Sequence, residues 1–348
     1  MTRIFPGYTY GSGPRAGCWW DTTCQIPDQP SLDAARSVDV AVIGAGFTGV
    51  SAALHLARFG VETIVLEAEF TGWGASGRNG GFCCLGGGML GDDQLDARFG
   101  KPERLEFRAA EKAAVALVAR LIAELDLDVD RHSAGETELA HRPKDMAALR
   151  RKAETTEENY GVSAQLIDQA DLPTQGLTGP FFGALTVPVG FGLNPLKYLT
   201  GVARAAEDAG ARIFHYTPVR ALVADGGRYR ITCDTGTVTA KNVVIATNGY
   251  SSEHLPPWLS GRYMPGQSNV LVTRPLIQAE IDAQGWSSDQ MCYDTRHLLH
   301  YFRLMPDRRF LFGMRGGLLS SPAADRRARK RILRDFANLF PAWAEGEP

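Results

Sequence analysis

A glycine-rich hexapeptide between two apolar stretches constrains this chain more than any other feature of its sequence. The hexapeptide is Gly44-Ala45-Gly46-Phe47-Thr48-Gly49. It follows a β-branched run at 38–43 that is typical of a buried parallel strand, and apolar residues then recur at helical spacing as far as Gly60. A second strand at 62–67 ends in the acidic Glu67. This order of strand, glycine loop, helix and strand predicts a βαβ unit of the Rossmann type.

The three glycines and the acidic residue of this unit each have a physical role in holding a dinucleotide. Gly44 permits the tight turn after the strand, and Gly46 lets the backbone approach a pyrophosphate with no Cβ in between. Gly49 lets the helix pack close to the strand. The free N–H groups and the dipole at the start of the helix attract phosphate groups. Glu67 is placed to accept hydrogen bonds from an adenosine ribose and disfavours a 2′-phosphate, which argues against NADP.

Two further segments favour FAD as the dinucleotide. The first, directly after the second strand, is the loop Gly74-Ala75-Ser76-Gly77-Arg78-Asn79-Gly80-Gly81, which suits a backbone lying against a flat or anionic ligand. An NAD dehydrogenase would normally continue here into a third βα unit, so the loop favours a cofactor that extends beyond the pyrophosphate. The second is a strand that ends in Thr247-Asn248-Gly249. Because strand ends of an open α/β sheet face the ligand crevice, we expect this strand to return the chain to the cofactor.

Composition points to two domains and excludes several classes of protein. The 348 residues are 44% hydrophobic, which is more than one compact core usually holds. A net charge of −2 gives no general attraction to nucleic acid or to an anionic membrane, and the N-terminal segment lacks the apolar core of a signal peptide. The six cysteines include no CxxC pair, so we expect no metal site. We therefore expect a soluble, cytoplasmic protein with neither a nucleic-acid nor a membrane partner.

The remaining sequence alternates between helical and strand patterns. Helices are expected at 102–125, 143–160, 194–209 and 325–340. Five short strands with turn residues between them are expected at 211–216, 220–224, 229–233, 237–239 and 242–247. Further strands are expected within 135–140, 181–193, 269–274 and 298–314. The fold class is therefore mixed α/β, with a Rossmann-type βαβ unit near the N-terminus.

With these segments in view, the sequence resembles a known enzyme class. The segments GAGFTG, LEA, GASGRNGG, TPV and ATNGY are similar to those of the FAD-dependent oxidoreductases of the D-amino-acid oxidase class. GASGRNGG is the most specific of them and resembles the gamma-glutamylputrescine oxidase branch. The similarity runs from about Trp19 to the end of the chain.

The resemblance implies a Rossmann-type FAD-binding domain interleaved with an antiparallel-sheet substrate domain, each assembled from separated segments. The expected parts are an N-terminal arm at 1–36, the FAD-binding domain at 37–130 and 194–252, the substrate domain at 131–193 and 253–320, and a C-terminal helix at 321–348. Members of the class continue beyond the point that corresponds to Pro348, so we expect the rest of the family domain to be missing from this sequence.

The resemblance also implies which residues bind FAD. The glycine loop holds the pyrophosphate, Glu67 holds the ribose, residues 75–81 line the flavin, Val219 contacts the adenine side, and Thr247–Gly249 close over the phosphates. The expected cofactor-binding residues are Gly44, Ala45, Gly46, Phe47, Thr48, Gly49, Glu67, Ala68, Ala75, Ser76, Gly77, Arg78, Asn79, Gly80, Gly81, Val219, Thr247, Asn248 and Gly249.

The implied reaction is oxidation of an amine C–N bond. Hydride passes from the carbon that bears nitrogen to flavin N5, and oxygen reoxidises the flavin to give peroxide. On the substrate side, relatives imply His300 or Tyr301, together with Arg315 as a partner for a substrate carboxylate. Neighbours in a strand point to opposite faces, so only one of His300 and Tyr301 can face the flavin.

Two alternatives remain open at this stage. One is an FAD-dependent dehydrogenase of the same class that acts on a 2-hydroxy acid or an amino acid and passes electrons to another acceptor. The other is a truncated, non-catalytic flavoprotein, because the part of the family domain expected to be missing would help to enclose the flavin ring.

Overall fold

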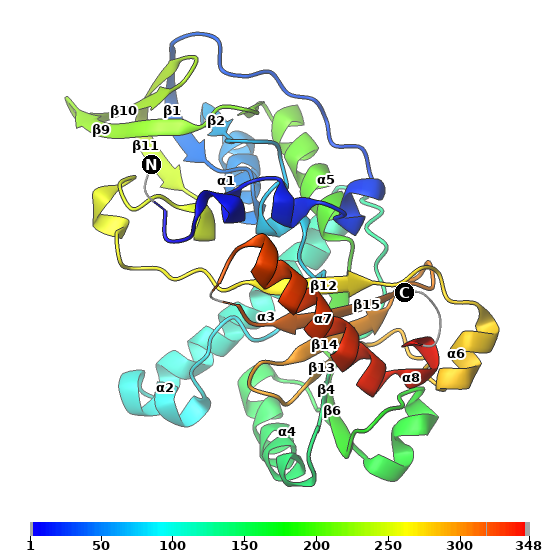
Figure 1. Ribbon diagram of the computed structural model, residues 1–348. Helices are drawn as coiled ribbons and strands as arrows, with labels where there is room; N and C mark the ends of the chain where they lie inside the picture. Colours follow the sequence, from blue (N-terminus) through cyan, green and yellow to red (C-terminus); the bar gives the residue numbers. More distant parts are fainter. Residues whose placement is uncertain (1–2, 318, 345–348) are drawn as a thin grey trace.

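The computed structural model describes residues 3–317 and 319–344, and its strands form two main sheets (Figure 1). The first has six strands in the order β8-β2-β1-β11-β10-β9. Strands β8, β2, β1 and β11 are parallel to one another, and β10 and β9 are antiparallel. Their bounds are β1 Arg36–Ile43, β2 Thr63–Leu66, β8 Arg212–Phe214, β9 Val219–Asp225, β10 Arg228–Cys233 and β11 Thr237–Ile245.

Two helices cover one face of this sheet, and the sequence explains both. Helix α1 (Phe47–Arg58) buries Val50, Ala53 and Leu54 at helical spacing. Helix α5 (Pro195–Asp208) packs against α1 and is capped by Asn194, whose side chain accepts hydrogen bonds from the N–H groups of Leu196 and Lys197. The predicted βαβ unit is therefore confirmed.

The second sheet has seven strands in the order β12-β15-β14-β13-β4-β6-β5. Their bounds are β4 Glu136–Leu139, β5 Gln165–Asp168, β6 Gly183–Val187, β12 Ser268–Val272, β13 Met291–Asp294, β14 His300–Leu304 and β15 Phe310–Arg315. Phe302, Phe310 and Phe312 point to one face, where helix α7 (Pro322–Leu339) packs on them through Phe336. Figure 1 shows α7 lying across this sheet. We call this the back face, and the face toward the first sheet the front face.

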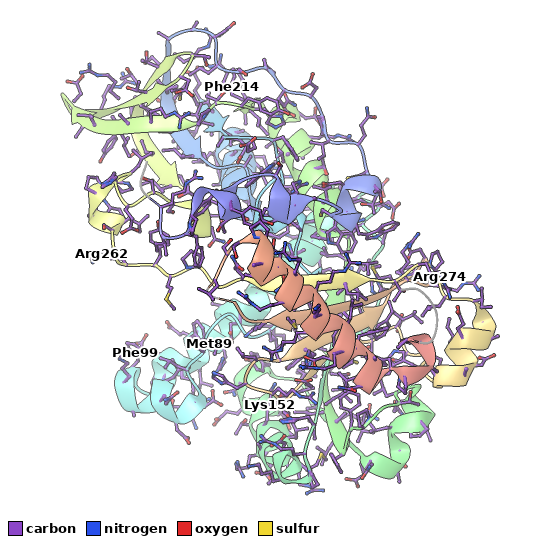
Figure 2. The ribbon with its side chains drawn as sticks, in the orientation of Figure 1. Met89, Phe99, Lys152, Phe214, Arg262 and Arg274 are labelled. Carbon is purple, nitrogen blue, oxygen red and sulfur yellow. The ribbon has the colours of Figure 1, made fainter. Side chains whose placement is uncertain are left out.

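Smaller elements connect the two sheets. A two-stranded sheet pairs β3 (Phe82–Cys84) with β7 (Gly190–Gly192). The other helices are α2 Asp92–Phe99, α3 Lys101–Glu124, α4 Met146–Tyr160, α6 Gln278–Gln284 and α8 Pro341–Ala344. Figure 2 shows Met89 and Phe99 on the outer side of the lobe formed around α2, and both side chains are exposed.

The N-terminal arm forms three short 3₁₀ helices at Gly7–Tyr10, Gly13–Arg15 and Trp19–Thr22. It contacts both halves of the molecule. Arg15 donates hydrogen bonds to the carbonyls of Gly72 (3.1 Å) and Trp73 (2.6 Å) beside the first sheet. Tyr8 donates to the carboxylate of Asp325 on α7, beside the second sheet. The arm therefore crosses the boundary between the two sheets.

The mixed α/β class is confirmed, and the strands fall into two interleaved groups as expected. Residues 237–247, for which two short strands were predicted, contain the single strand β11. None of the described helices has an apolar stretch long enough to cross a membrane.

Candidate functional site

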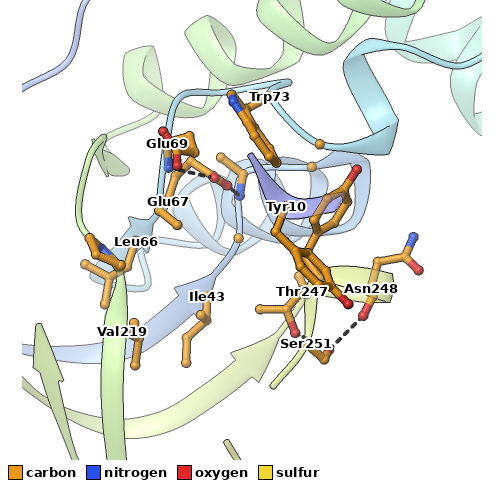
Figure 3. A pocket seen from close by; sticks show the side chains of 18 of the residues that line it. Tyr10, Ile43, Leu66, Glu67, Glu69, Trp73, Val219, Thr247, Asn248 and Ser251 are labelled. Carbon is orange, nitrogen blue, oxygen red and sulfur yellow. Dashed lines mark hydrogen bonds between the residues drawn. The ribbon is translucent and has the colours of Figure 1, made fainter. Parts of the chain in front are cut away.

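The candidate site is a cavity at the carboxyl ends of three neighbouring parallel strands, β2, β1 and β11 (Figure 3). This is where an open α/β sheet binds its ligand. Leu66, Ile43 and Val219 lie at one end of the cavity, and Thr247 and Asn248 lie at the other. The predicted cofactor residues that line it are Gly44, Ala45, Gly46, Glu67, Ala68, Ala75, Ser76, Val219, Thr247 and Asn248.

The glycine loop has the geometry that a dinucleotide requires. Gly44 has a φ of +105°, and a Cβ there would lie 2.7 Å from the carbonyl oxygen of Ala246 on the neighbouring strand. A Cβ on Gly49 would collide with the carbonyl oxygen of Gly44, so only glycine lets α1 approach β1 this closely. These two positions therefore have the roles that the sequence predicted.

Helix α1 presents its N-terminus to the cavity. Its N-cap residue, Gly46, supplies no side-chain cap, and the N–H of Phe47 donates to the hydroxyl of Ser76 at 3.0 Å. A helix start of this kind attracts a phosphate through its dipole and its N–H groups. A Cβ on Gly46 would lie 2.8 Å from the Ser76 hydroxyl, so glycine at this position also lets Ser76 come close to the start of the helix. The residues present fit a pyrophosphate.

Glu67 lies where β2 ends and is held rigidly. Its carboxylate accepts hydrogen bonds from the N–H of Ala45 at 2.7 Å and the N–H of Glu69 at 3.1 Å. Burial raises the pKa of this carboxyl group, and the two N–H donors oppose that effect. The carboxylate is thus fixed beside the glycine loop, at the place where a Rossmann fold binds the ribose.

Aromatic residues that the sequence did not indicate complete the cavity. Tyr10, Trp73 and Tyr250 all line it, with the rings of Trp73 and Tyr250 5.7 Å apart and those of Tyr10 and Tyr250 6.1 Å apart. Arg78 places its guanidinium 5.2 Å from the Trp73 ring and donates to the Tyr250 hydroxyl. Trp73 and Tyr250 each adjoin a predicted segment, but Tyr10 comes from the distant arm, and no local motif marks it.

The loop at 75–81 is stabilised by its own side chains and by the arm. Asn79 donates to the carbonyl of Ser76 at 2.9 Å and accepts from the N–H of Gly81 at 2.8 Å. The indole N–H of Trp20 donates to the carbonyl of Asn79 at 2.8 Å. The predicted cofactor residues that do not line the cavity are Phe47, Thr48, Gly49, Gly77, Arg78, Asn79, Gly80, Gly81 and Gly249. Several of them instead shape the backbone beside the cavity.

On the second sheet, Tyr301 and His300 face opposite ways. The Tyr301 ring lies against the backbone of Gly80 and Gly313, and its hydroxyl is 2.8 Å from that of Ser268. Tyr301 therefore faces the glycine-rich loop at 74–81. The structure brings these two predicted regions together.

His300 points to the back face of the same sheet. Its Nδ1 lies 2.9 Å from a carboxylate oxygen of Asp294, and its Nε2 lies 3.3 Å from one of Asp335 on α7. The ring also stacks on Phe312, with the centroids 5.1 Å apart. The structure thus separates His300 from the loop that Tyr301 faces.

Arg315 ends β15 opposite Ser268 and is exposed. Because it lies two residues beyond Gly313, which pairs with Tyr301, it is on the front face. Among the described residues, no carboxylate forms an ion pair with its guanidinium. Arg315 is therefore a cation at the edge of the front face.

Cys83 and Cys84, the adjacent cysteines of the sequence, lie in β3. Both are half-buried and unpaired by disulfides. Burial raises the pKa of the Cys83 thiol to about 12, which makes it a poor nucleophile at neutral pH.

These features define a Rossmann-type dinucleotide-binding protein: parallel strands, a glycine loop, a helix N-terminus at the cavity and a fixed carboxylate. A second sheet lies over the loop beside the cavity. The family whose description is "FAD dependent oxidoreductase" matches residues 39–347, and this chain belongs to that family. FAD is accordingly its cofactor.

Individual relatives agree with this assignment. The chain is 31% identical over 299 residues to the probable oxidoreductase OrdL of Haemophilus influenzae, an alignment that covers 85% of this chain and 69% of OrdL. It is 28% identical over 312 residues to the gamma-glutamylputrescine oxidoreductase of Escherichia coli, covering 89% of this chain and 72% of that protein. The crystal structure of glycine oxidase from Geobacillus kaustophilus matches its fold with a TM-score of 0.66 at 19% identity, covering 88% of this chain and 79% of the other.

Proposed function

We propose that this protein oxidises the C–N bond of a small amine or amino acid derivative, with oxygen as the final electron acceptor. The main support for the proposal is the contact between Tyr301 and Gly80. Tyr301 lies on the front face of the second sheet, and Gly80 lies in the loop next to the dinucleotide cavity. A substrate bound against the front face next to this contact would lie beside the bound cofactor. The amine class is supported by the similarity to gamma-glutamylputrescine oxidoreductase.

In this proposal the glycine loop at 44–49 holds the pyrophosphate of FAD and Glu67 holds the ribose. Val219 borders the adenine, residues 75–81 line the flavin, and Thr247–Gly249 close over the phosphates. When bound, FAD supplies the hydride-accepting chemistry that no amino acid side chain has. The protein itself binds and orients the amine. No dedicated base is required if the amine binds in its neutral form.

Substrate contacts are proposed for two side chains of the front face. Tyr301 contributes an aromatic wall and a hydroxyl that Ser268 orients. Arg315 is placed to pair with a carboxylate on the substrate, because its guanidinium is exposed and has no acidic partner of its own among the described residues. His300, on the back face, has no proposed contact with substrate.

The test is a panel of primary amines, secondary amines, amino acids of both configurations and 2-hydroxy acids, with gamma-glutamylputrescine among the amines. Peroxide release is measured for each compound at equal concentration. The proposal expects peroxide from at least one amine and none from the 2-hydroxy acids. Turnover of a 2-hydroxy acid with an artificial electron acceptor, without peroxide from any amine, would favour the dehydrogenase alternative instead.

A variant tests the role of Arg315. Arg315→Ala should raise KM about tenfold or more for an amine that carries a carboxylate and leave KM unchanged for an amine that lacks one. Arg329→Ala is the matched control, because Arg329 is an exposed arginine on α7. Unchanged kinetics in the Arg315 variant would remove this residue from the site.

A further inference from the structure

Arg303 is a buried cation that no carboxylate of the described residues contacts directly, although the charges of Asp130 and Asp307 act on it from farther away. It lies in the middle of β14 on the front face, two residues from Tyr301, and its side chain has no exposed surface. No carboxylate of the described residues forms an ion pair with it. Burial lowers its pKa to about 9, so the guanidinium keeps its charge at neutral pH.

Hydrogen bonds fix this guanidinium under the glycine-rich loop. Its Nε donates to the carbonyl of Gly80 at 3.1 Å, and its Nη2 donates to the carbonyl of Leu193 at 2.8 Å. Its Nη1 lies 2.8 Å from Nε2 of His132. A guanidinium only donates, so Nε2 of His132 must be the acceptor.

The partner histidine is neutral, so it does not offset the positive charge of Arg303. His132 Nδ1 lies 2.7 Å from the carbonyl oxygen of Asp130, which only accepts, so the ring's one proton is on Nδ1. Burial, and then the charge of Arg303, lower the pKa of His132 to about 4. The positive charge of Arg303 therefore remains uncompensated within hydrogen-bonding distance.

The backbone around Arg303 is shaped to admit it. A Cβ on Gly192 would lie 2.6 Å from Nη1 of Arg303 and 2.6 Å from Nε2 of His132. Gly81 has a φ of +69°, and a Cβ there would collide with Nη2. The rings of Trp20 and Phe82 lie 5.8 Å from the guanidinium carbon.

Two carbonyl contacts and one imidazole contact compensate a buried charge less well than a carboxylate does. A neutral side chain would avoid the free-energy cost of burying a charge. We therefore expect the positive charge of Arg303 to have a function. A hydride carries two electrons and one proton, so an acceptor that takes it up gains one negative charge. A fixed cation in a water-poor site stabilises charge that develops next to it.

We propose that Arg303 is the cation that stabilises the negative charge which the flavin ring gains on reduction. The inference rests on the proposed placement of the ring against residues 75–81. Arg303 acts through its field and through the Gly80 carbonyl that it holds, so it is a positioning and electrostatic residue and has no role as a base.

The test is the midpoint potential of bound FAD, measured in a dye-coupled reductive titration. In Arg303→Met the equilibrium constant for two-electron reduction should fall about tenfold or more, which corresponds to a drop of ~30 mV or more. Arg303→Lys keeps the charge and should stay close to the wild-type potential at pH 7. His132→Gln, which keeps both the cation and an acceptor for it, is the control and should also leave the potential unchanged.

An unchanged potential in an FAD-loaded Arg303→Met protein would overturn the proposal and leave Arg303 as a structural tie between loops. If that variant does not retain FAD, Arg303→Lys decides. A buried lysine loses its proton at lower pH than an exposed one. The potential of Arg303→Lys should then fall below that of the wild type as the pH rises from 7 toward 9, and identical potentials throughout this range would contradict the proposal. The measurement uses no amine, so its result is independent of the proposed substrate.

Discussion

At the scale of single residues, substitutions at the two glycines that flank α1 distinguish an effect on cofactor binding from an effect on backbone strain. Gly44 and Gly60 both have a positive φ, of +105° and +73°. A Cβ on Gly44 would meet the Ala246 carbonyl, whereas nothing lies within 4 Å of one on Gly60. Each alanine substitution carries a conformational cost of about 1 kcal/mol, but only the one at Gly44 displaces the loop that holds the pyrophosphate.

We therefore expect Gly44→Ala to weaken FAD binding about tenfold or more and Gly60→Ala to lower stability with little change in FAD affinity. Quenching of flavin fluorescence on titration of the apoprotein measures the affinity, and thermal unfolding of the apoprotein measures the stability. Equal FAD affinities in the two variants would show that the loop does not contact the cofactor.

Tyr301 and His300 provide a second comparison, between neighbours on opposite faces of one strand. Tyr301→Phe removes a hydroxyl that Ser268 orients at 2.8 Å on the front face. We expect it to lower kcat/KM for the amine severalfold with little loss of stability. His300→Leu breaks two contacts to carboxylates on the back face and should lower the melting temperature while kcat/KM changes less than twofold. The reverse pattern, found by steady-state kinetics and calorimetry, would place the substrate on the other side of the sheet.

At the scale of elements, the N-terminal arm supports the cofactor loop from outside the Rossmann unit. Arg15 is buried and holds the carbonyls of Gly72 and Trp73, and Trp73 lines the cavity. Arg15→Met should therefore weaken FAD binding severalfold, because two buried carbonyls lose their donor. Arg36→Met is the matched control: its ion pair with the exposed Asp33 contributes little.

Isothermal titration of the apoproteins with FAD measures both variants. The expected result is a higher dissociation constant for Arg15→Met and an unchanged one for Arg36→Met. Identical dissociation constants would mean that the arm covers the site without supporting it.

The sequence predicts those parts of the site that follow from local rules. Gly44, Gly49 and Glu67 sit in one contiguous βαβ unit, where the turn, the helix approach and the strand end are fixed by residues close in sequence. Tyr10 and Arg303 could not be predicted this way. Tyr10 lines the cavity but lies in the N-terminal arm, outside the βαβ unit. Arg303 can be assigned a role only from its hydrogen bonds to Gly80 and Leu193, which are far from it along the chain.

The difference between local rules and contacts over long sequence distances also explains which elements the sequence did not predict. Strand β3 has only three residues and is held by β7, more than 100 residues away, so its own sequence shows no strand pattern. The choice between His300 and Tyr301 depended on which face of the second sheet α7 covers. That is a tertiary fact, and the period-2 rule could only state that the two residues differ.

At the scale of the whole molecule, two buried neutral histidines make stability depend on pH. Burial lowers the pKa of His132 and of His215 to about 4, against about 6.5 in an unfolded chain. Between pH 4 and 6.5 the unfolded chain binds more protons than the folded protein does. The free energy of unfolding is therefore highest, as far as these two histidines are concerned, above pH 6.5, and it decreases as the pH falls toward 4. The two shifts together correspond to at most about 7 kcal/mol of unfolding free energy.

Substituting both histidines should flatten that dependence. In His132→Gln and His215→Gln the amide oxygen replaces the accepting Nε2, which in His215 receives the N–H of Thr71 at 3.1 Å. We expect the melting temperature of the doubly substituted apoprotein to vary less between pH 7.5 and 4.5 than that of the wild type. Parallel curves for the two proteins would show that these histidines titrate normally in the fold.

The proposed reaction requires the second sheet to present an amine to FAD that the first sheet holds. Mixing the FAD-loaded protein with the amine panel under anaerobic conditions, while recording the visible spectrum, tests this most directly because it needs neither oxygen nor turnover. We expect at least one amine to bleach the absorption bands of the bound FAD, and Tyr301→Phe to slow the bleaching. FAD that remains oxidised with every amine, although dithionite reduces it fully, would contradict the proposed reaction.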